Sequence, residues 1–212
     1  MASEGNFISE YIVPMFQKGS IGVCIDIGAY DPIWINNSIE LENLGWRCYC
    51  IEPNPHCIPA LKSVRKNVLE YAIGATNKDN VDFYINYVDP LPHHSRHLGE
   101  AGYTGINKIP TSQAGVVTVE KVKLRTFEWV MENEIKEEHV DVISIDVEGN
   151  EMDVLATLDV SRWLPKVVIC ENSNNNIEQH NWFEMMGFGK IKRHCDNDIY
   201  VRLSEIRLRV GK

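Results

Sequence analysis

The sequence predicts an α/β fold in which helices cover both faces of a mostly parallel sheet. Short apolar runs such as Val23–Ile27 and Arg47–Ile51 end in turns that contain glycine or proline, as buried strands do. Amphipathic segments separate these runs, and that alternation is typical of parallel strands joined by helices. The last two runs, Phe188–Arg193 and Ile199–Leu203, are joined by a short turn and should therefore pair antiparallel.

The composition is that of an acidic globular protein. A length of 212 residues suits a single α/β domain, and we expect one domain over residues 1–212. The net charge of −9 argues against a large nucleic-acid interface, which needs a basic face. The six cysteines form no C-x-x-C pair, so they indicate neither a zinc site nor a redox dithiol and favour a reducing, cytoplasmic setting. No signal-like N-terminus and no run of 18 apolar residues occurs, so we expect no contact with a membrane, while the oligomeric state stays open.

Helices are predicted from apolar spacing and from capping residues. The first is an amphipathic helix over residues 5–18. Asn36 to Ser38 can cap a short helix at residues 39–44, whose free N–H groups would suit a carboxylate. The remaining expected helices are residues 59–66, 125–133 and 182–186 and one that follows Glu151, and the remaining strands are residues 68–73, 141–147 and 167–170.

An inserted region, about residues 78–123, interrupts the alternation. Val81–Tyr87 and Val116–Leu124 alternate like strands, and the segment between them is rich in Pro, Gly and His. Long connections of this kind are usually functional, so we expect a hairpin with a lid above the site. His93, His94 and His97 lie in this segment, and a solvated turn, a substrate contact and a metal cluster all remain open for them.

The end of the first strand is the expected ligand site. In parallel sheets, ligands bind beyond the carboxyl ends of the strands, where Asp26, Gly28 and Asp31 would lie. Glu52 follows Gly28 by 24 positions, near the spacing that places an acid on a ribose diol. Because the glycines that cradle a pyrophosphate are missing, a nucleoside ligand without pyrophosphate is favoured. The alternative is an ordinary turn followed by an incidental acid.

Acidic residues also end two later strands. Asp146 and Glu148 follow one strand, and Glu171 and Asn172 follow the next. In a parallel sheet these groups would lie side by side at the same edge as Gly28. Oxygen ligands from Asp146, Glu171 and Asn172 would suit Mg²⁺, or one carboxylate could act as a general base whose pKa its neighbour raises. Alternatively, Asp146 and Glu148 cap the following helix.

Several blocks of the sequence together resemble the FkbM-type methyltransferases, and the resemblance extends from about Gly22 to Leu203. The most specific block is Ile-Asp-Val-Glu-Gly-Asn-Glu at residues 145–151, and the others are residues 26–29, 45–46, 50–55, 72–74 and 197–201. The sequence departs from that family at Pro32 and Trp34, where a glycine is common, and this affects the shape expected for the methionine pocket. Asp146 with Glu171 and Asn172 is also similar to the metal-ligand arrangement of catechol-type O-methyltransferases.

The resemblance implies a Rossmann-like class I methyltransferase with a seven-stranded sheet whose last strand is antiparallel. It implies S-adenosylmethionine as the cofactor and methyl transfer to a hydroxyl of a sugar or small molecule. The Asp26–Gly28 loop would hold the methionine part, Glu52 the ribose hydroxyls and Ala72–Ile73 the adenine. The expected cofactor contacts are Asp26, Gly28, Ala29, Tyr30, Asp31, Asn37, Ser38, Glu52, Pro53, Asn54, Ala72, Ile73 and Asp146.

The sequence therefore predicts an S-adenosylmethionine-dependent O-methyltransferase. Mg²⁺ is a second candidate cofactor. The expected catalytic residues are Asp146, Glu148 and Glu171, the expected substrate contacts are His94, His97, Arg125 and Asn172, and the expected metal ligands are Asp146, Glu171 and Asn172. The alternatives are a nucleic-acid or protein methyltransferase on the same fold, and a cofactor-binding partner subunit without activity. A basic face around Lys62, Arg65 and Lys66 would favour the former, although a solvated helix face explains these three residues equally well.

Overall fold

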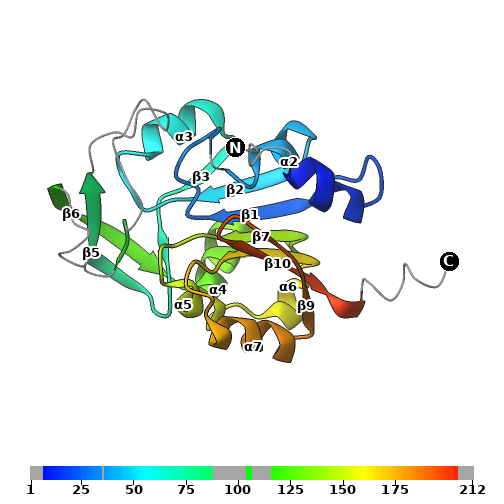
Figure 1. Cartoon of the computed structure of the whole chain (residues 1–212). Coiled ribbons are helices and arrows are strands. Elements are labelled where there is room, and N and C mark those ends of the chain that lie inside the picture. Colours follow the sequence, from blue (N-terminus) through cyan, green and yellow to red (C-terminus); the bar gives the residue numbers. More distant parts are fainter. Residues whose placement is uncertain (1–6, 35, 88–103, 107–115, 205–212) are drawn as a thin grey trace.

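A computed structural model describes residues 7–34, 36–87, 104–106 and 116–204 (Figure 1). A seven-stranded sheet forms its centre, with the strand order β3-β2-β1-β7-β8-β10-β9. The strands from β3 to β8 in this order run parallel, and β10 is antiparallel to both of its neighbours. Their bounds are β1 Val23–Ile27, β2 Arg47–Ile51, β3 Asn67–Leu69, β7 Val142–Ile145, β8 Val167–Glu171, β9 Phe188–His194 and β10 Asn197–Arg202. The predicted antiparallel end of the sheet is confirmed.

The central strands are buried because both of their faces are covered. All five residues of β1 are buried; Val23, Ile25 and Ile27 belong to one apolar cluster, and Cys24 belongs to another on the opposite face. Ile25 and its neighbours on one face pack against α4 (Phe127–Val130), α5 (Glu151–Leu155), α6 (Val160–Trp163) and α7 (Ile177–Met185). Cys24 on the other face packs against the N-terminal segment and α2 (Ile39–Asn43), and α3 (Ile58–Val64) covers the adjoining part. Figure 1 shows the two helical layers on opposite sides of the sheet.

The inserted region forms a small sheet of its own. Strands β5 (Lys78–Tyr87) and β6 (Val116–Arg125) pair antiparallel, which confirms the predicted hairpin. The prediction of one continuous strand over residues 68–73 was wrong. The chain leaves the main sheet after β3, and the next strand, β4 (Ala72–Ile73), pairs with β6 instead. His93, His94 and His97 lie outside the described residues.

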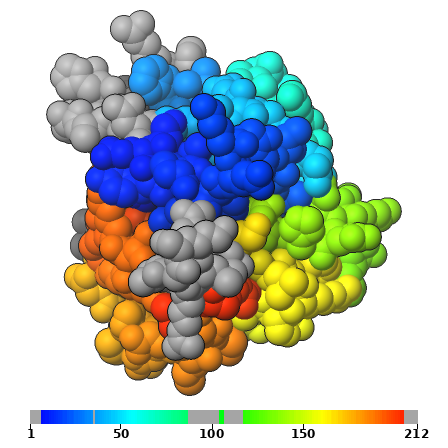
Figure 2. All heavy atoms as spheres, turned by 90° about the vertical axis from the view of Figure 1, so that its right-hand side faces the viewer, coloured from blue at the N-terminus to red at the C-terminus, as the bar shows by residue number. Residues whose placement is uncertain are grey.

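The N-terminal segment is irregular rather than one helix. A π-helical turn, Ile8–Ile12, passes directly into a 3₁₀ turn, Val13–Met15, that contains Pro14. Proline cannot donate a backbone hydrogen bond, so a regular α-helix over residues 5–18 is not formed. The apolar side chains still cover the sheet as expected, and Ile12 is fully buried. Figure 2 shows this segment, in dark blue, lying against the C-terminal strands, where Phe7 stacks on His194.

Most helices differ from the prediction in length. The helix expected at residues 125–133 is α4 followed by a π-helical turn, Met131–Ile135, and α7 begins five residues before the predicted position, at Ile177. The side chain of Asn176 explains this start because it accepts hydrogen bonds from the N–H groups of Glu178 and Gln179. The short helix α6 was not predicted. None of the helices in the described part of the chain is long and apolar enough to cross a membrane.

Candidate active site

The acidic residues predicted from the sequence lie in one row at the carboxyl edge of the sheet. Ile27 of β1 pairs with Ile51 of β2 and with Ile145 of β7, and Ile145 pairs with Cys170 of β8. The residues that follow these pairs are therefore neighbours across the strands. They are, in the order of the strands, Glu52, Gly28, Asp146 and Glu171.

Gly28 allows the loop after β1 to lie against the loop after β7. Its φ of +83° is a left-handed conformation that favours glycine, and a Cβ atom at this position would lie 1.7 Å from the backbone oxygen of Asp146. The N–H of Gly28 donates to the backbone oxygen of Ile51 at 2.9 Å, and the N–H of Asp146 donates to that of Ile27. The backbone thus places Asp146 directly against the glycine loop.

Glu52 is held at the end of β2 by backbone donors. The N–H of Tyr30 donates to Glu52 Oε2 at 2.9 Å, and the N–H of Asn54 donates to Oε1 at 2.8 Å. Glu52 is 5% exposed. These contacts join the loops after β1 and β2, with Pro53 in the same turn, and fix the carboxylate where the sequence predicted a ribose contact.

The loop from Ala29 to Ser38 is built on Asp31 and Asn36. Asp31 Oδ1 accepts hydrogen bonds from the N–H groups of Ile33 and Trp34, whose side chains are exposed. Asn36 Oδ1 accepts from the N–H groups of Ser38 and Ile39, both at 2.9 Å. Of the three residues expected to cap α2, Asn36 to Ser38, it is Asn36 whose side chain does so. Contrary to expectation, the N–H of Ile39 is therefore not free for a ligand carboxylate.

Asp26 and Ser38 face the covered side of the sheet. Ser38 is fully buried, and its hydroxyl donates to Asp26 Oδ2 at 2.5 Å. Burial raises the pKa of the Asp26 carboxyl, while the Ser38 hydrogen bond and the charge of Arg65 lower it. Asn37 donates from Nδ2 to the hydroxyl of Ser144 on β7 at 3.1 Å. Asp26 and Ser38 are therefore bound to protein groups in this structure.

Asp146 and Glu171 place two carboxyl groups beside each other. Burial raises the pKa of Asp146 well above its usual range, and the charge of Glu171 raises it further, followed by that of Glu148. Glu171 also accepts a hydrogen bond from the Ser173 hydroxyl at 2.5 Å. A carboxyl in these surroundings keeps its proton to a higher pH than an ordinary aspartate, which is the property of a base matched to neutral pH.

Glu151 has a positional role that the sequence analysis did not assign. Its Oε1 accepts hydrogen bonds from the N–H groups of Val147 and Gly149 at 3.3 and 3.0 Å. The loop between them holds Glu148 and Gly149 at φ values of +55° and +98°. Glu151 thus fixes the turn that follows Asp146. These contacts reach back four and two positions along the chain, and no pattern used in the sequence predicted them.

The predicted magnesium site has no support in this geometry. Asn172 is buried, its Oδ1 accepts a hydrogen bond from the N–H of Asn176 at 2.5 Å, and its Nδ2 donates to Asp198 Oδ2 at 2.9 Å. The amide oxygen is therefore bound to the backbone of Asn176, the residue that caps α7, and the amide nitrogen is bound to Asp198, so both atoms are already engaged within the protein. Within the described ranges, no three His, Cys, Asp or Glu side chains gather as a metal site would need.

Arg125 and Arg65 are bound to acidic residues of the protein, which the sequence did not predict. Arg125 donates to Asp79 Oδ1 at 2.7 Å and stacks over Trp129, so it fastens the hairpin in this structure rather than standing open to a substrate. Arg65 was expected on a solvated or basic helix face, and this was wrong, because its side chain is fully buried against Glu42. Ala72 and Ile73, the expected adenine contacts, are buried in β4.

Comparison with known proteins gives the family. The model of the methyltransferase FkbM domain matches residues 26–199. A crystal structure of the methyltransferase FkbM from Methylobacillus flagellatus KT is similar, with a TM-score of 0.54 and 12% sequence identity over 91% of this chain. The chain spans 46% of that protein's length, and at this identity the likeness concerns the fold alone. A search of the curated proteins found no match. The family match covers most of the chain, including every residue of the acidic row, and the chain therefore belongs to the FkbM methyltransferase family.

Proposed function

We propose that this protein is an S-adenosylmethionine-dependent O-methyltransferase with a Rossmann-like class I fold. The acceptor in this proposal is a hydroxyl group of a small molecule or a sugar. The observation that carries the proposal is the row of Glu52, Gly28, Asp146 and Glu171 along one sheet edge, in a chain of the FkbM family. Ligands of parallel sheets bind beyond this edge.

The residues present suit the cofactor. A buried carboxylate fixed by two backbone donors, Glu52, is suited to accept hydrogen bonds from ribose hydroxyls. The backbone from Gly28 to Asp31 comes next to it and would hold the methionine part, and Ala72–Ile73 would contact the adenine. The remaining cofactor contacts are proposed as predicted from the sequence, while the internal bonds of Asp26 and Ser38 favour an indirect role for both.

The proposed chemistry is a displacement at a methyl group. S-adenosylmethionine supplies a methyl on a sulfonium sulfur. The acceptor oxygen forms the new bond to this methyl as the sulfur–carbon bond breaks, and S-adenosylhomocysteine leaves with the bonding electrons. The chain has to align the hydroxyl and take its proton. Asp146 is the proposed base, Glu171 raises its proton affinity, and Glu148 lies in the same turn.

An RNA substrate loses support from the structure of the basic segment. Arg65 is buried, so it cannot form a phosphate-binding face with Lys62 and Lys66. Lys62 is also paired with Glu70. A small neutral acceptor agrees better with the net charge of −9. A cytoplasmic location remains part of the proposal.

Calorimetric titration tests the proposal. We expect S-adenosylmethionine and S-adenosylhomocysteine to bind in the micromolar range and NAD not to bind, with a panel of hydroxyl compounds then screened for methyl transfer. Glu52→Gln should weaken both adenosyl ligands about tenfold, as expected for the loss of a hydrogen bond to a charged group. Glu70→Gln, at an exposed site, is the matched control. Binding of NAD alone, or of neither adenosyl ligand, would contradict the proposal.

A further inference from the structure

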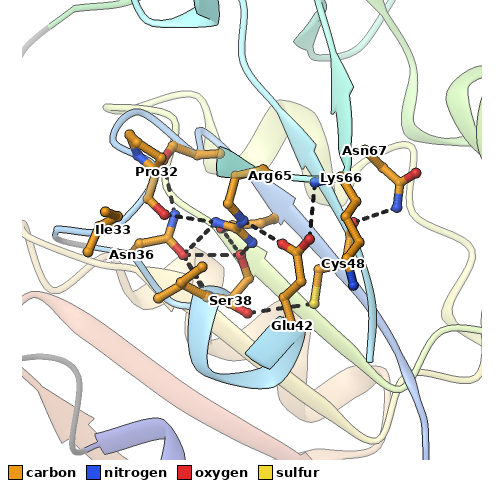
Figure 3. Close-up of polar contacts among 12 residues, drawn as sticks. Pro32, Ile33, Asn36, Ser38, Glu42, Cys48, Arg65, Lys66 and Asn67 are labelled. Atoms are coloured by element: carbon orange, nitrogen blue, oxygen red, sulfur yellow. Dashed lines mark hydrogen bonds and ion pairs between the residues drawn. The ribbon is translucent and has the colours of Figure 1, made fainter. Parts of the chain in front are cut away.

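A buried guanidinium lies under the loop that follows β1. Arg65 comes directly after α3, and its side chain has no exposed surface. Figure 3 shows that it points into the space between the loop at Pro32 to Ser38 and helix α2. A buried charge is costly unless it is paired and fully hydrogen-bonded, so each contact of this side chain matters.

The guanidinium contacts three parts of the chain at once. Its Nε donates to Glu42 Oε2 at 2.5 Å, and its Nη2 donates to the Ser38 hydroxyl at 2.7 Å. Its Nη1 donates to Asn36 Oδ1 at 3.1 Å and to the backbone oxygen of Pro32 at 3.5 Å. These directions follow the planar fork of arginine, which lysine cannot reproduce. We call Arg65, Glu42, Ser38 and Asn36 the arginine network.

The arginine network continues into the proposed methionine loop. Asn36 Nδ2 donates to the backbone oxygens of Ala29 and Asp31 at 3.2 and 3.0 Å. The Ser38 hydroxyl donates to Asp26, two residues before Gly28. Arg65 therefore contacts one end of the loop, Asn36 and Ser38, directly, and the Asn36 side chain links it to the other end. Apolar packing holds Ala29, whereas Ile33 and Trp34 are exposed, so polar contacts fix the described part of the loop that follows Asp31.

The paired charges do not by themselves explain this arrangement. A buried ion pair is weak evidence for stability, because apolar residues of similar volume often serve as well. What apolar side chains could not supply is a donor to each of the groups that shape the loop. Glu42 completes the anchor, since its Oε1 also accepts a hydrogen bond from the N–H of Lys66 at 3.0 Å.

We propose that Arg65 is a positioning residue that holds the two ends of the loop after β1, Ala29–Pro32 and Asn36–Ser38, in the shape that receives the methionine end of the cofactor. This inference rests on the proposed function. It assigns a role to the end of α3, which carries none of the predicted site residues. It also predicts a specific pattern of ligand affinities, because the adenosine end is bound by other loops.

The test compares two ligands that differ at the methionine end. S-adenosylhomocysteine carries the amino acid, and 5′-methylthioadenosine lacks it. Arg65→Lys keeps the charge but loses the fork, so we expect about a tenfold loss of affinity for S-adenosylhomocysteine and less than about a twofold loss for 5′-methylthioadenosine. A merely structural role would weaken the two ligands equally, and equal losses or no loss would overturn the proposal.

Arg202→Lys is the matched control. Arg202 donates to the backbone oxygens of Pro165 and Val160 at 2.9 and 2.7 Å, near the opposite edge of the sheet. The Arg202→Lys variant should have a lower melting temperature than wild type but an unchanged ratio of the affinities for S-adenosylhomocysteine and 5′-methylthioadenosine. Backbone hydrogen exchange of residues 29–38, compared between wild type and Arg65→Lys without ligand, tests the positioning role independently of the proposed function. If wild type binds neither ligand, the proposed function fails, and unchanged exchange in Arg65→Lys would then overturn the positioning role as well.

Discussion

The buried carboxylate of Glu42 on α2 and the half-buried carboxyl pair of Asp146 and Glu171 at the sheet edge have opposite electrostatic surroundings. In the arginine network, the carboxylate of Glu42 meets a guanidinium at 2.5 Å. At the carboxyl edge, Asp146 meets the carboxyl of Glu171, and in the described part of the chain neither of the two forms an ion pair with a Lys, Arg or His. The first group is compensated inside the protein. The second retains its electrostatic strain.

The difference separates scaffold from chemistry. A paired charge changes its protonation state with difficulty, so it is suited to holding a loop. A carboxyl whose pKa is raised by burial and by a second acid binds a proton readily near neutral pH, as a base must. Removing a carboxylate should therefore have opposite effects on stability in the two groups, which the following variants test.

Asp146→Asn should have the largest effect on activity. Losing a general base costs about 10²- to 10⁴-fold in rate, measured as methyl transfer to the acceptor found in the hydroxyl screen. Affinity for S-adenosylhomocysteine should change little. Because the folded state raises the pKa of Asp146, the contribution of this residue to wild-type stability falls as the pH rises above the ordinary value of about 3.9. The variant lacks this loss, so its melting temperature should exceed that of wild type at pH 8.

Asp153→Asn is the control for that experiment. Asp153 is exposed on α5, so neither rate nor melting temperature should change. Normal turnover by Asp146→Asn would exclude it as the base. A lower melting temperature at pH 8 would show that the carboxylate is compensated after all, as in the arginine network.

Glu42→Gln should have the largest effect on stability. Removing one partner of a buried ion pair leaves the guanidinium uncompensated, which costs about 3–5 kcal/mol in the free energy of unfolding. Denaturant unfolding measures this loss. The matched control, Glu70→Gln, breaks the exposed pair with Lys62 and should cost less than about 1 kcal/mol. Equal losses in the two variants would contradict the distinction between the groups.

The sheet was predictable because its strands are short apolar runs bounded by turns. The runs at residues 23–27, 47–51 and 188–193 have a pattern that only buried or half-buried strands satisfy, and the structure confirms all three as strands. The acidic edge was predictable for a related reason. In a parallel sheet, residues that follow different strands meet at one edge, so sequence position alone brings Glu52, Asp146 and Glu171 together.

The remaining features depend on contacts between distant residues. Arg65 is buried because Glu42, 23 positions earlier in the chain, faces it. The spacing of apolar residues around Arg65 does not reveal a contact with so distant a residue. Asn172 follows a strand just as Asp146 does, yet its side-chain amide binds the N–H of Asn176 and the carboxylate of Asp198, which lie 4 and 26 positions later in the chain. The strand predicted at residues 68–73 divides because its second half finds a partner in β6, far along the chain.

Glu171→Gln should sharpen the account of the acidic pair. Without the neighbouring negative charge, Asp146 should ionise at lower pH, so the acid limb of the pH–rate profile should move to lower pH. The rate at neutral pH should fall less than about tenfold, because the base itself remains. An unchanged limb would show that the charge of Glu171 does not raise the pKa of Asp146. Glu178→Gln, at an exposed position on α7, is the control.

Asp26→Asn should have the smallest effect and tests a residue that shares features of both groups. Burial raises the pKa of Asp26, yet Ser38 and Arg65 oppose the shift. The raised pKa means that the contribution of Asp26 to stability is greatest at low pH and is lost as the pH rises through the folded-state pKa. Asparagine does not titrate, so the stability of the variant relative to wild type should increase from pH 4 to pH 8, measured by denaturant unfolding. A relative decrease would place Asp26 among the compensated carboxylates, since its charged form would then stabilise the fold as that of Glu42 does.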